Sequence, residues 1–343
     1  MLLAATAPNR IDFAGGTTDL FPLYLLMGRG CTVNLAIDVA SHAFIRTTPG
    51  EDIVLESRDL NRSLRVDSTL SLEDAGPLKL LVLTVRAFSP LKGFHLITHN
   101  DAPSGSGLGA SSALLIAMLG VLNSMHQKVH IEPSQLIQLA TNIETAVLGI
   151  PAGSQDHIAA LFGGLNVIRF DVHGFQRQQV ELDEKDKQTL EDMIILSYTG
   201  ESRFSGMNNW DIIKAFIDGK EDTSENLLQI RDLSEELATE LEKKRFDLLP
   251  TFVRKEWSLR KELSAGVTNP EVESLMAAAV RKGALANKLC GAGGGGCMIS
   301  LVDKHDRPKV EKAIQEAGGR IIPFSIDTHG LRVEERDDLQ FTT

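Results

Sequence analysis

A glycine-rich segment near residue 105 is the part of this sequence best suited to holding an anion. Glycine lets the backbone approach a ligand closely, and the segment runs straight into a predicted helix over 112–125. The start of a helix presents free N–H groups and the positive end of the helix dipole, so a phosphate group would be stabilised there. The segment consists of Pro103, Ser104, Gly105, Ser106, Gly107, Leu108, Gly109, Ala110, Ser111 and Ser112.

Two common nucleotide-binding motifs can be tested against this segment. The Walker pattern is not satisfied, because no lysine precedes the serines. The spacing Gly105-x-Gly107-x-x-Ala110 fits a loose dinucleotide fingerprint, but polar residues 100–104 separate the glycines from the predicted strand before them. The helix after the glycines is also followed by another helix rather than by a strand that ends in an acidic residue. A phosphate group is therefore favoured over a dinucleotide, and a turn without a ligand stays the alternative.

Two carboxylates lie downstream of this segment. Glu144 falls within the apolar sector of a predicted helix over 134–148, where a charge is costly unless it meets a cation or a metal. The alternative is a glutamate at the edge of the apolar stripe that bends to solvent. Asp156 falls in the first turn of a short helical pattern that ends at Phe162. A carboxylate there either complements the helix dipole or is aimed at a ligand.

A second glycine run extends from Lys288 to Gly296. It lies between a helix predicted to begin at Asn269-Pro270 and an apolar strand predicted over 297–302. A flexible linker is the usual interpretation of a glycine run, but here the flanking elements are short-range partners. We therefore predict a close backbone approach to a ligand or to the first glycine segment.

The composition excludes several classes of protein. The chain has 343 residues, of which 43% are hydrophobic and 24% charged, which is enough apolar material for a packed core and excludes general disorder. The net charge of −11 offers no basic footprint for nucleic acid. Two basic clusters, 243–245 and 260–261, are predicted to be solvated helix ends. An acidic total repels anionic ligands unless positive potential is concentrated locally.

The chain is predicted to be a soluble protein of the cytoplasm. It has three cysteines with no close-spaced pair, which is typical of a reducing compartment. The N-terminus is a poor signal peptide, and the longest apolar run, 113–122, is about half of what a membrane span needs. We expect no nucleic-acid partner and no membrane, and a homodimer is compatible with these features.

Strands and helices are mixed in both halves of the chain, which favours an α/β plus α+β architecture. Further helices are predicted over 78–88 and over most of 204–287. A charged stretch, 181–191, separates the halves, so we expect domains at residues 1–180 and 181–343. The predicted strands cover 32–37, 43–47, 53–57, 94–98 and 165–170 in the first half and 193–198, 297–302, 321–326 and 331–334 in the second.

Three segments resemble, in order, the three motifs of the GHMP kinase superfamily, which includes galactokinase, homoserine kinase and mevalonate kinase. The first is Ala7-Pro-Asn-Arg10-Ile-Asp-Phe-Ala-Gly15-Gly16-Thr-Thr-Asp19, the second is 103–113 and the third is 291–296. Three ordered motifs are far more specific than any one of them. The resemblance implies ATP and Mg²⁺ as cofactors. It also implies an N-terminal ribosomal-protein-S5-like α/β domain and a C-terminal ferredoxin-like domain, with the active site between them.

The resemblance further implies roles for the chemical groups singled out above. Residues 103–112 would hold ATP, and Ser112 with Glu144 would bind Mg²⁺, whose preferred ligands are oxygen atoms. Asp156 would face the accepting hydroxyl as a general base or an orienting group. Arg10 would lie beside Asp156 and the transferring phosphoryl group, keeping the carboxylate ionised and offsetting the developing charge.

The substrate side of the site follows from the same resemblance. Arg203 and Lys288 are candidates for holding the substrate's own phosphate, and an ordinary surface or helix-end charge is the alternative for each. Asp19 would hold sugar hydroxyls. The other predicted substrate-binding residues are Gly15, Gly16, Thr18, Gly293 and Gly294.

Within the superfamily the chain most resembles the bacterial D-glycero-D-manno-heptose 7-phosphate kinases, through residues 14–19, 155–166, 198–203 and 288–296. The implied reaction is attack of the anomeric hydroxyl of the sugar phosphate on the γ-phosphate of ATP, which gives a heptose 1,7-bisphosphate. The alternatives are a kinase of a free sugar, such as fucose, galactose or a uronic acid, and a non-catalytic ligand-sensing relative.

Four positions depart from the pattern of that family. Asn9, Asp12 and Thr17 stand where Leu, Ser and Gly are expected, and His157 stands where Gln is usual. All four lie in or beside the substrate-side motifs. They bear on the identity of the sugar more than on the phosphoryl chemistry.

Overall fold

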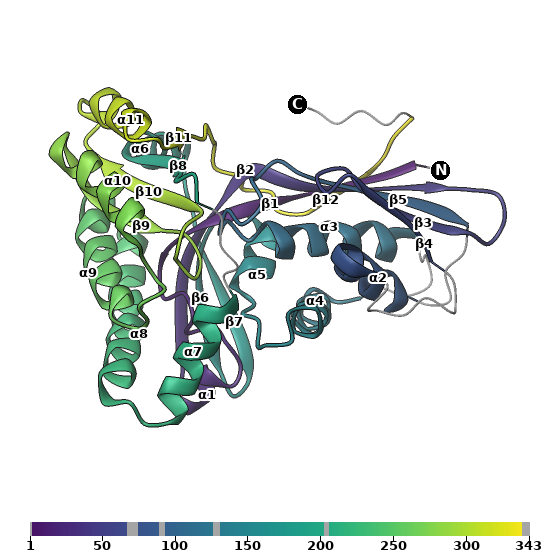
Figure 1. Ribbon diagram of the computed structural model, residues 1–343, viewed down its shortest axis with the longest axis horizontal. Coiled ribbons are helices and arrows are strands. Elements are labelled where there is room, and N and C mark those ends of the chain that lie inside the picture. The colour runs from purple at the N-terminus through teal and green to yellow at the C-terminus, as the bar shows by residue number, and fades with distance from the viewer. Residues whose placement is uncertain (1, 67–74, 89–92, 126–130, 202–205, 338–343) are drawn as a thin grey trace.

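The computed structural model describes residues 2–66, 75–88, 93–125, 131–201 and 206–337. It contains two β-sheets with helices packed against them (Figure 1). The eight-stranded sheet follows the order β12-β1-β2-β5-β3-β4, with β6 and β7 attached through β2, and the four-stranded sheet follows the order β11-β8-β10-β9.

Two long strands form the centre of the large sheet. β1 (Leu2–Ala14) and β2 (Gly30–Thr47) run antiparallel, and every residue of β1 except Thr6 is buried. The first part of β2 pairs with β6 (Leu165–Asp171), whereas its second part pairs with β5 (Phe94–Asn100). β2 thereby holds both wings of the sheet together.

β1 was not among the strands predicted from the sequence. Pro8 cannot donate a ladder hydrogen bond, and the pairing with β2 shifts register between Pro8 and Asn9. Arg10 and Asp12 are also charged residues that face the protein interior. The segment that carries Arg10 and Asp12 therefore lacks the sequence pattern of a strand, although it forms a buried strand inside the sheet.

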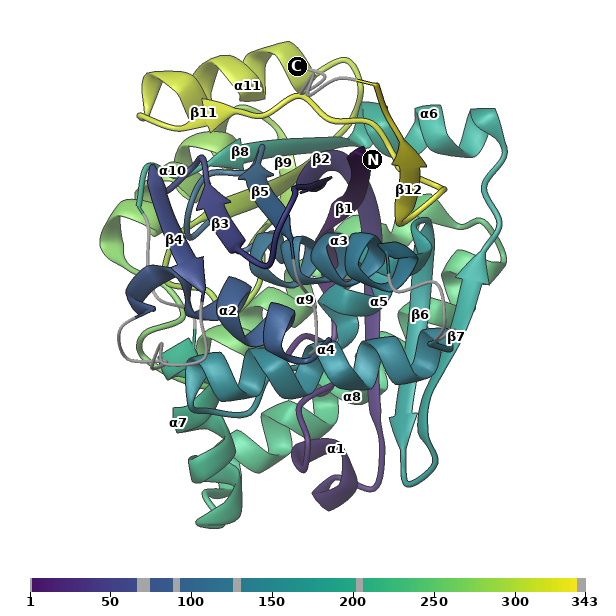
Figure 2. The ribbon, with the colours of Figure 1, turned by 90° about the vertical axis from the view of Figure 1, so that its right-hand side faces the viewer.

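Four helices cover one face of the large sheet (Figures 1 and 2). Among them, α3 is buried on nearly every side, because it lies between the strands β1 and β2 and the neighbouring helices. This explains its continuous apolar sequence. The four helices are α2 (Lys79–Arg86), α3 (Ala110–Met125), α4 (Pro133–Leu148) and α5 (Gln155–Phe162), and the other strands of this sheet are β3 (Ile53–Ser57), β4 (Arg62–Val66), β7 (Gly174–Val180) and β12 (Arg332–Glu335).

The small sheet is antiparallel, and the longer helices of the second half lie beside it (Figure 1). Its strands are β8 (Ile194–Tyr198), β9 (Ala284–Leu289), β10 (Cys297–Val302) and β11 (Arg320–Ile321). The remaining helices are α1 (Leu23–Leu26), α6 (Glu184–Met193), α7 (Gly206–Ile217), α8 (Glu221–Glu242), α9 (Leu249–Lys261), α10 (Pro270–Arg281) and α11 (Arg307–Glu316).

Two predictions for the second half were wrong. The helical pattern was extended to residue 287, but α10 ends at Arg281 and the chain returns as β9, which pairs with β10. The turn contains Gly283 at a φ of 113°, a conformation that favours glycine. The strand predicted over 321–326 is reduced to β11 and an isolated bridge between Ile326 and Ile37.

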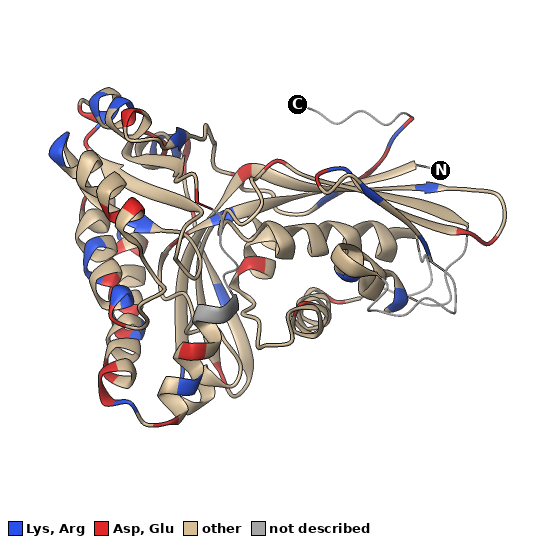
Figure 3. Cartoon of the chain, viewed as in Figure 1, with Lys and Arg blue, Asp and Glu red and all other residues tan. Residues whose placement is uncertain are grey.

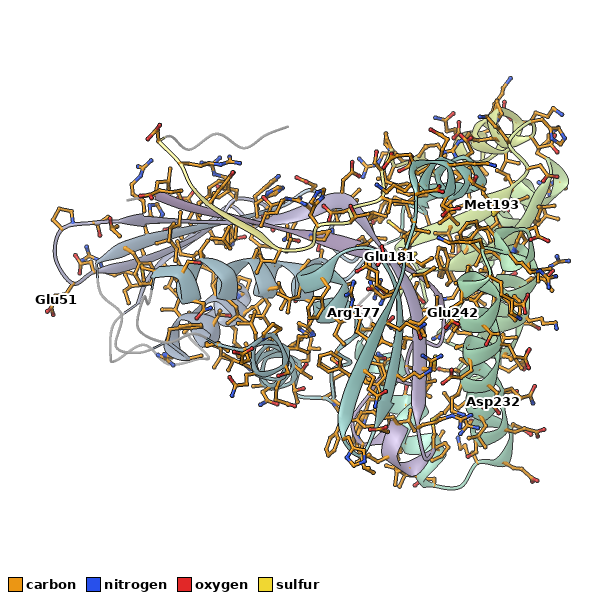
Figure 4. All side chains as sticks on the ribbon, turned by 180° about the vertical axis from the view of Figure 1, so that it is seen from behind. Glu51, Arg177, Glu181, Met193, Asp232 and Glu242 are labelled. Carbon is orange, nitrogen blue, oxygen red and sulfur yellow. The ribbon has the colours of Figure 1, made fainter. Side chains whose placement is uncertain are left out.

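The second half of the chain is joined to the first in several places. β12 pairs with β1, so the C-terminal part of the chain returns to the large sheet. One hydrophobic cluster contains Ile11 and Val33 of the large sheet together with Val253 and Ile299. Where β7 lies beside α8, Gln178 donates a 2.9 Å hydrogen bond to Glu242. Figure 4 labels Glu242 and Arg177, the residue before Gln178 in the sequence. The division at residues 180 and 181 stays a prediction.

Charged residues of both signs are interspersed on α8, α9 and α11 (Figure 3). They form local pairs such as Lys243 with Glu240 at 3.0 Å and Arg307 with Glu311 at 2.7 Å. Within the described ranges, no helix combines the length and the hydropathy required to cross a membrane.

Candidate active site

A pocket of about 220 Å³ lies where the start of α3, the start of α5 and the turn after β1 meet. Its wall combines bare backbone with a few ionisable side chains. Arg10 is the one basic side chain on this wall among the residues that the structure describes. The acidic side chains on the wall are Asp19, Glu144 and Asp156, and the first glycine segment supplies Gly105, Ser106, Gly107, Gly109, Ala110, Ser111 and Ser112.

Arg10 and Asp156 form a direct ion pair on the wall of this pocket, the proximity that the family resemblance implied. Arg10 projects from β1, and its Nε and Nη2 atoms lie 2.7 and 2.6 Å from Asp156 Oδ1. Asp156 stands in the first turn of α5. Arg10 Nη1 also donates a 2.5 Å hydrogen bond to the carbonyl oxygen of Gly107. One guanidinium therefore connects the carboxylate to the glycine segment.

The pKa values of this pair follow from burial and from their charged neighbours. Burial raises the pKa of Asp156, and the negative charge of Glu144 raises it further, whereas Arg10 opposes the shift. Burial alone would lower the pKa of Arg10, but Asp156 and Asp12 raise it above its ordinary value. Arg10 therefore stays charged beside a carboxylate whose basicity is increased.

Glu144 and Ser112 also come together on the wall of this pocket. The Ser112 hydroxyl donates to Glu144 at 2.9 and 3.1 Å, and His157 Nε2 lies 3.1 Å from Glu144 Oε2. Only 8% of Glu144 is exposed, so the alternative of a glutamate bending to solvent is wrong. Burial raises its pKa, but His157 and Ser112 outweigh this effect and the pKa is lowered. An ionised carboxylate beside a hydroxyl is an oxygen donor set that fits a hard divalent cation.

The two glycine segments contact each other, as one interpretation of the second run predicted. Cys297 N donates to Ser106 O at 2.6 Å, and a Cβ atom on Gly107 would overlap the carbonyl oxygen of Cys290. Gly291 and Ala292 therefore reach the pocket wall beside the first segment.

Several predicted residues of the glycine segments lie away from the pocket wall. Pro103, Ser104 and Leu108 do not line it, and Leu108 is fully buried, where its carbonyl oxygen accepts from Arg10 N at 3.0 Å. Gly293 and Gly294 lie against Val267, whose carbonyl oxygen accepts from Gly294 N at 2.7 Å. The predicted roles of these residues in binding ATP or the acceptor stay predictions.

The turn after β1 brings Gly16, Thr17 and Asp19 to the pocket. Gly15 and Thr18 lie behind it, where the Thr18 hydroxyl donates to Gly15 O at 2.7 Å and closes the turn. Asp19 Oδ2 accepts from Gln155 N at 3.1 Å, and burial raises the pKa of Asp19 to about 6.

The expected role of Lys288 in holding a substrate phosphate is not supported. Its side chain is fully buried, and Nζ lies 2.6 Å from Asp12 Oδ2 and 3.6 Å from Glu256 Oε2. Lys288 is also absent from the wall of the pocket. An ammonium group held between two buried carboxylates neutralises them and is not available to a ligand. Arg203, the other candidate, lies outside the described residues.

Arg260 is the residue that sequence reasoning missed. It was predicted to be a solvated helix end, but only 1% of it is exposed. Its Nη2 atom lies 2.6 Å from Glu256 Oε1 and donates to Gly16 O at 2.8 Å, so it fixes the turn that carries Asp19. The signal was present in the sequence, because Glu256 and Arg260 continue the buried stripe of Leu249 and Val253 at helical spacing.

Comparison with known proteins agrees with this architecture. Residues 78–164 match the GHMP kinases N terminal domain, and residues 237–320 match the GHMP kinases C terminal domain. The chain is 29% identical over 338 residues to the D-glycero-alpha-D-manno-heptose 7-phosphate kinase of Campylobacter jejuni, covering 95% of this chain and 96% of that protein. It is 25% identical to the galactokinase of Pyrococcus furiosus, covering 91% of this chain and 92% of that protein.

The fold is also similar to a solved structure. The crystal structure of a D-glycero-D-manno-heptose 1-phosphate kinase from Bacteroides thetaiotaomicron has a TM-score of 0.79 to this chain at 22% identity. The likeness covers 98% of this chain and 100% of that one. The predicted two-domain fold class is therefore confirmed.

The buried position of Lys288 leads to a stability prediction. We expect Lys288→Met to lower the free energy of unfolding by about 3–5 kcal/mol, because it removes the cation nearest to the buried carboxylate of Asp12 and leaves Arg10, 3.8 Å away, as its remaining ion-pair partner. Urea denaturation would measure this. Adding Asp12→Asn should recover part of the loss, since the excess negative charge is then removed. Lys304→Met is the matched control, because its 2.7 Å pair with Asp192 is at the surface and should contribute at most about 1 kcal/mol. Equal losses in the two lysine variants would contradict the buried pairing.

The contact between the glycine segments leads to a second prediction. Gly107→Ala should weaken ATP binding and lower stability, because the new methyl group would overlap the Cys290 carbonyl and φ is +73°. Gly149→Ala is the matched control: φ is +71°, but no atom lies within 4 Å of its Cβ position. The control should lose only about 1 kcal/mol of stability from backbone strain. Calorimetric titration with ATP and thermal unfolding measure both effects, and similar losses in the two variants would refute the contact.

Proposed function

Since this chain belongs to the GHMP kinase superfamily, we propose that it transfers the γ-phosphoryl group of ATP to the anomeric hydroxyl of D-glycero-D-manno-heptose 7-phosphate, giving the 1,7-bisphosphate. The enzyme is an ATP-dependent kinase, and the identity of the acceptor is the proposed part. The observation that carries the proposal is the pairing of Asp156 with Arg10 inside the pocket at 2.6 Å. This pairing supports the proposal, because it would provide a base and a fixed cation at the point of transfer.

Asp156 and Arg10 divide the chemical work between them. The raised basicity of Asp156 suits it to accept the proton of the attacking hydroxyl or to orient that hydroxyl. Arg10 holds the carboxylate in place and contributes positive charge where negative charge develops on the phosphoryl oxygens. Phosphoryl transfer depends chiefly on positioning and charge stabilisation, so a phosphate-binding loop, a metal ion, one base and one cation would be a sufficient set.

The glycine segments and the start of α3 would hold the phosphates of ATP. Backbone N–H groups and the helix dipole favour anions at this position. Ser112 and Glu144 would hold Mg²⁺, because they supply oxygen ligands and a negative charge on the same wall. When bound, the ion would neutralise charge on the phosphate groups of ATP.

The acceptor is inferred from similarity and from the turn after β1. The relative with heptose 7-phosphate kinase activity aligns with nearly the whole chain. Asp19, held by Gln155 N and facing the pocket, would accept hydrogen bonds from sugar hydroxyls. Arg203 would contact the phosphate of the acceptor.

A free sugar is the second candidate acceptor, and the position of Lys288 favours it. Lys288 is sealed between Asp12 and Glu256. Arg10, the basic side chain on the described pocket wall, is already paired with Asp156. A substrate without a phosphate would need no further cation.

A panel of acceptors would test the proposed function. The wild-type enzyme, supplied with ATP and Mg²⁺, should release ADP with heptose 7-phosphate at a higher kcat/KM than with free heptose, fucose, galactose or a uronic acid. The preference is expected because a relative that aligns with 95% of this chain is a heptose 7-phosphate kinase. A higher kcat/KM for a free sugar would select the second candidate, and the absence of ADP release above background with every acceptor would refute both.

Asp156→Asn tests the chemical assignment within the same panel. Loss of a general base costs about 100-fold or more in kcat, whereas the dissociation constant for ATP should change less than about twofold, since the residue faces the acceptor. Stopped-flow turnover and calorimetric ATP titration measure the two quantities. Turnover equal to that of the wild type would remove Asp156 from the mechanism.

Glu144→Gln tests the predicted metal site. The substitution keeps the hydrogen bond from Ser112 but removes the negative charge, so the Mg²⁺ concentration for half-maximal activity should rise about tenfold or more. Direct titration of Mg²⁺ into the ATP complex gives a readout that does not depend on turnover. Glu225→Gln, an exposed glutamate on α8, is the control. Identical Mg²⁺ titrations in both variants would exclude Glu144 as a ligand.

A further inference from the structure

A second cavity of about 500 Å³ adjoins the catalytic pocket, and we call it the side pocket. Asp19, Pro151 and Ala152 line both spaces, so the carboxylate of Asp19 forms part of the wall between them. The side pocket lies between α1, α4 and the hairpin of β6 and β7. A molecule that is held by Asp19 can therefore extend from one space into the other.

One wall of the side pocket is a polar stripe along α4. Its residues recur at helical spacing, so they share one face of the helix. All of them are uncharged, and each carries a hydroxyl or an amide. The stripe consists of Ser134, Gln138, Thr141, Asn142 and Thr145. Gln138 and Asn142 are exposed side chains joined by a 3.0 Å hydrogen bond, and they keep further donors and acceptors for a ligand.

The opposite wall is aromatic. Tyr24 packs between Phe21 and Phe170, with ring centroids 6.2 and 5.7 Å away. Phe21 remains 59% exposed although it is large and apolar, and it lines the side pocket with Phe175. A ring left open to a cavity opposite hydrogen-bonding groups suits a ligand that has apolar C–H faces and polar edges.

The charge of the side pocket further limits the chemical class of ligand that it can hold. Asp19 is the one ionisable acid or base on its wall besides Tyr24, within the described part of the chain. A phosphate or carboxylate would meet no cation there and would lie near the Asp19 carboxylate. Hydroxyl groups both donate and accept hydrogen bonds, and they match the amides and hydroxyls of the α4 stripe.

We propose that the side pocket binds the uncharged, hydroxyl-bearing chain of the acceptor sugar that extends beyond the ring held by Asp19. This inference rests on the proposed phosphoryl transfer to a sugar and adds what selects the sugar. The side pocket thereby selects acceptor sugars by the length of their exocyclic chain. A phosphate at the end of that chain lies outside the side pocket.

A series of free sugars with one ring configuration tests the proposal. D-lyxose, D-mannose and D-glycero-D-manno-heptose differ only in the number of exocyclic carbons, each of which carries a hydroxyl. In the wild-type enzyme, kcat/KM should increase along this series. The double variant Gln138→Ala/Asn142→Ala should raise KM for the heptose about tenfold, as expected for the loss of two hydrogen-bonding groups, and change KM for lyxose less than about twofold. A loss that is equal for all three sugars, or no loss at all, would overturn the proposal.

The matched control is Gln188→Ala on α6. Gln188 is also an exposed helix glutamine, and it donates a 3.0 Å hydrogen bond to Asp192 four residues later, as Gln138 does to Asn142. This variant should leave all three KM values unchanged. A control variant that loses heptose selectively would show that the effect does not come from the side pocket.

Two further measurements separate this inference from the proposed function. If no sugar is phosphorylated, the proposed function fails, and calorimetric binding of the heptose alone decides the side pocket: support requires about tenfold weaker binding in the double variant. Heptose 7-phosphate serves as the charged probe. If its advantage over free heptose disappears in the double variant, the phosphate lies in the side pocket and the uncharged assignment is wrong.

Discussion

The candidate active site depends on a line of alternating charges, which are buried except for the partly exposed Asp156. Asp156 pairs with Arg10, which lies 3.8 Å from Asp12, and Asp12 pairs with Lys288. Beyond Lys288 the line continues through Glu256 to Arg260. An isolated buried charge is very costly, so each of these groups is held where its neighbours are. The geometry of the site is therefore enforced electrostatically as well as by packing.

This line of charges also joins parts of the chain that are distant in sequence. Asp12 lies on β1, Lys288 on β9 and Arg260 on α9. Asp12 Oδ1 accepts from Gly291 N at 2.9 Å, which fixes the second glycine segment, while Arg260 holds the carbonyl of Gly16. The same group of buried charges thereby fixes both the segment that would hold ATP and the turn that would hold the acceptor. The net charge of −11 does not decide what this site can bind, because the wall of the pocket combines three carboxylates with the positive charge of Arg10 and the positive end of the α3 dipole.

How much of the site could be predicted differs between its parts. Glu144 and Asp156 were found because local patterns reveal them: one lies in an apolar stripe, the other in the first turn of a helix after a glycine-bearing turn. Lys288 was misjudged because its partners, Asp12 and Glu256, are distant in sequence and no local pattern shows that they converge. β1 was missed for the same physical reason. Its polar residues do not show the pattern of a buried strand, because their buried partners are distant in sequence. β3, by contrast, has the ordinary alternation of a strand and was predicted with its observed bounds.

The two ends of the proposed acceptor meet walls of different chemistry. At the reacting end, Asp156 and Arg10 belong to a network of buried charges in which a single substitution leaves a partner uncompensated. At the far end, Gln138 and Asn142 are exposed, and Phe21 is mostly open to solvent. Substitutions there disturb no buried charge and little packing. In the proposed reaction, the chemistry of transfer would thus depend on residues whose change destabilises the protein, while selectivity for the acceptor would depend on residues that can change independently. Asp19 is the single carboxylate that faces both regions, so the position of the sugar ring is the quantity that couples them.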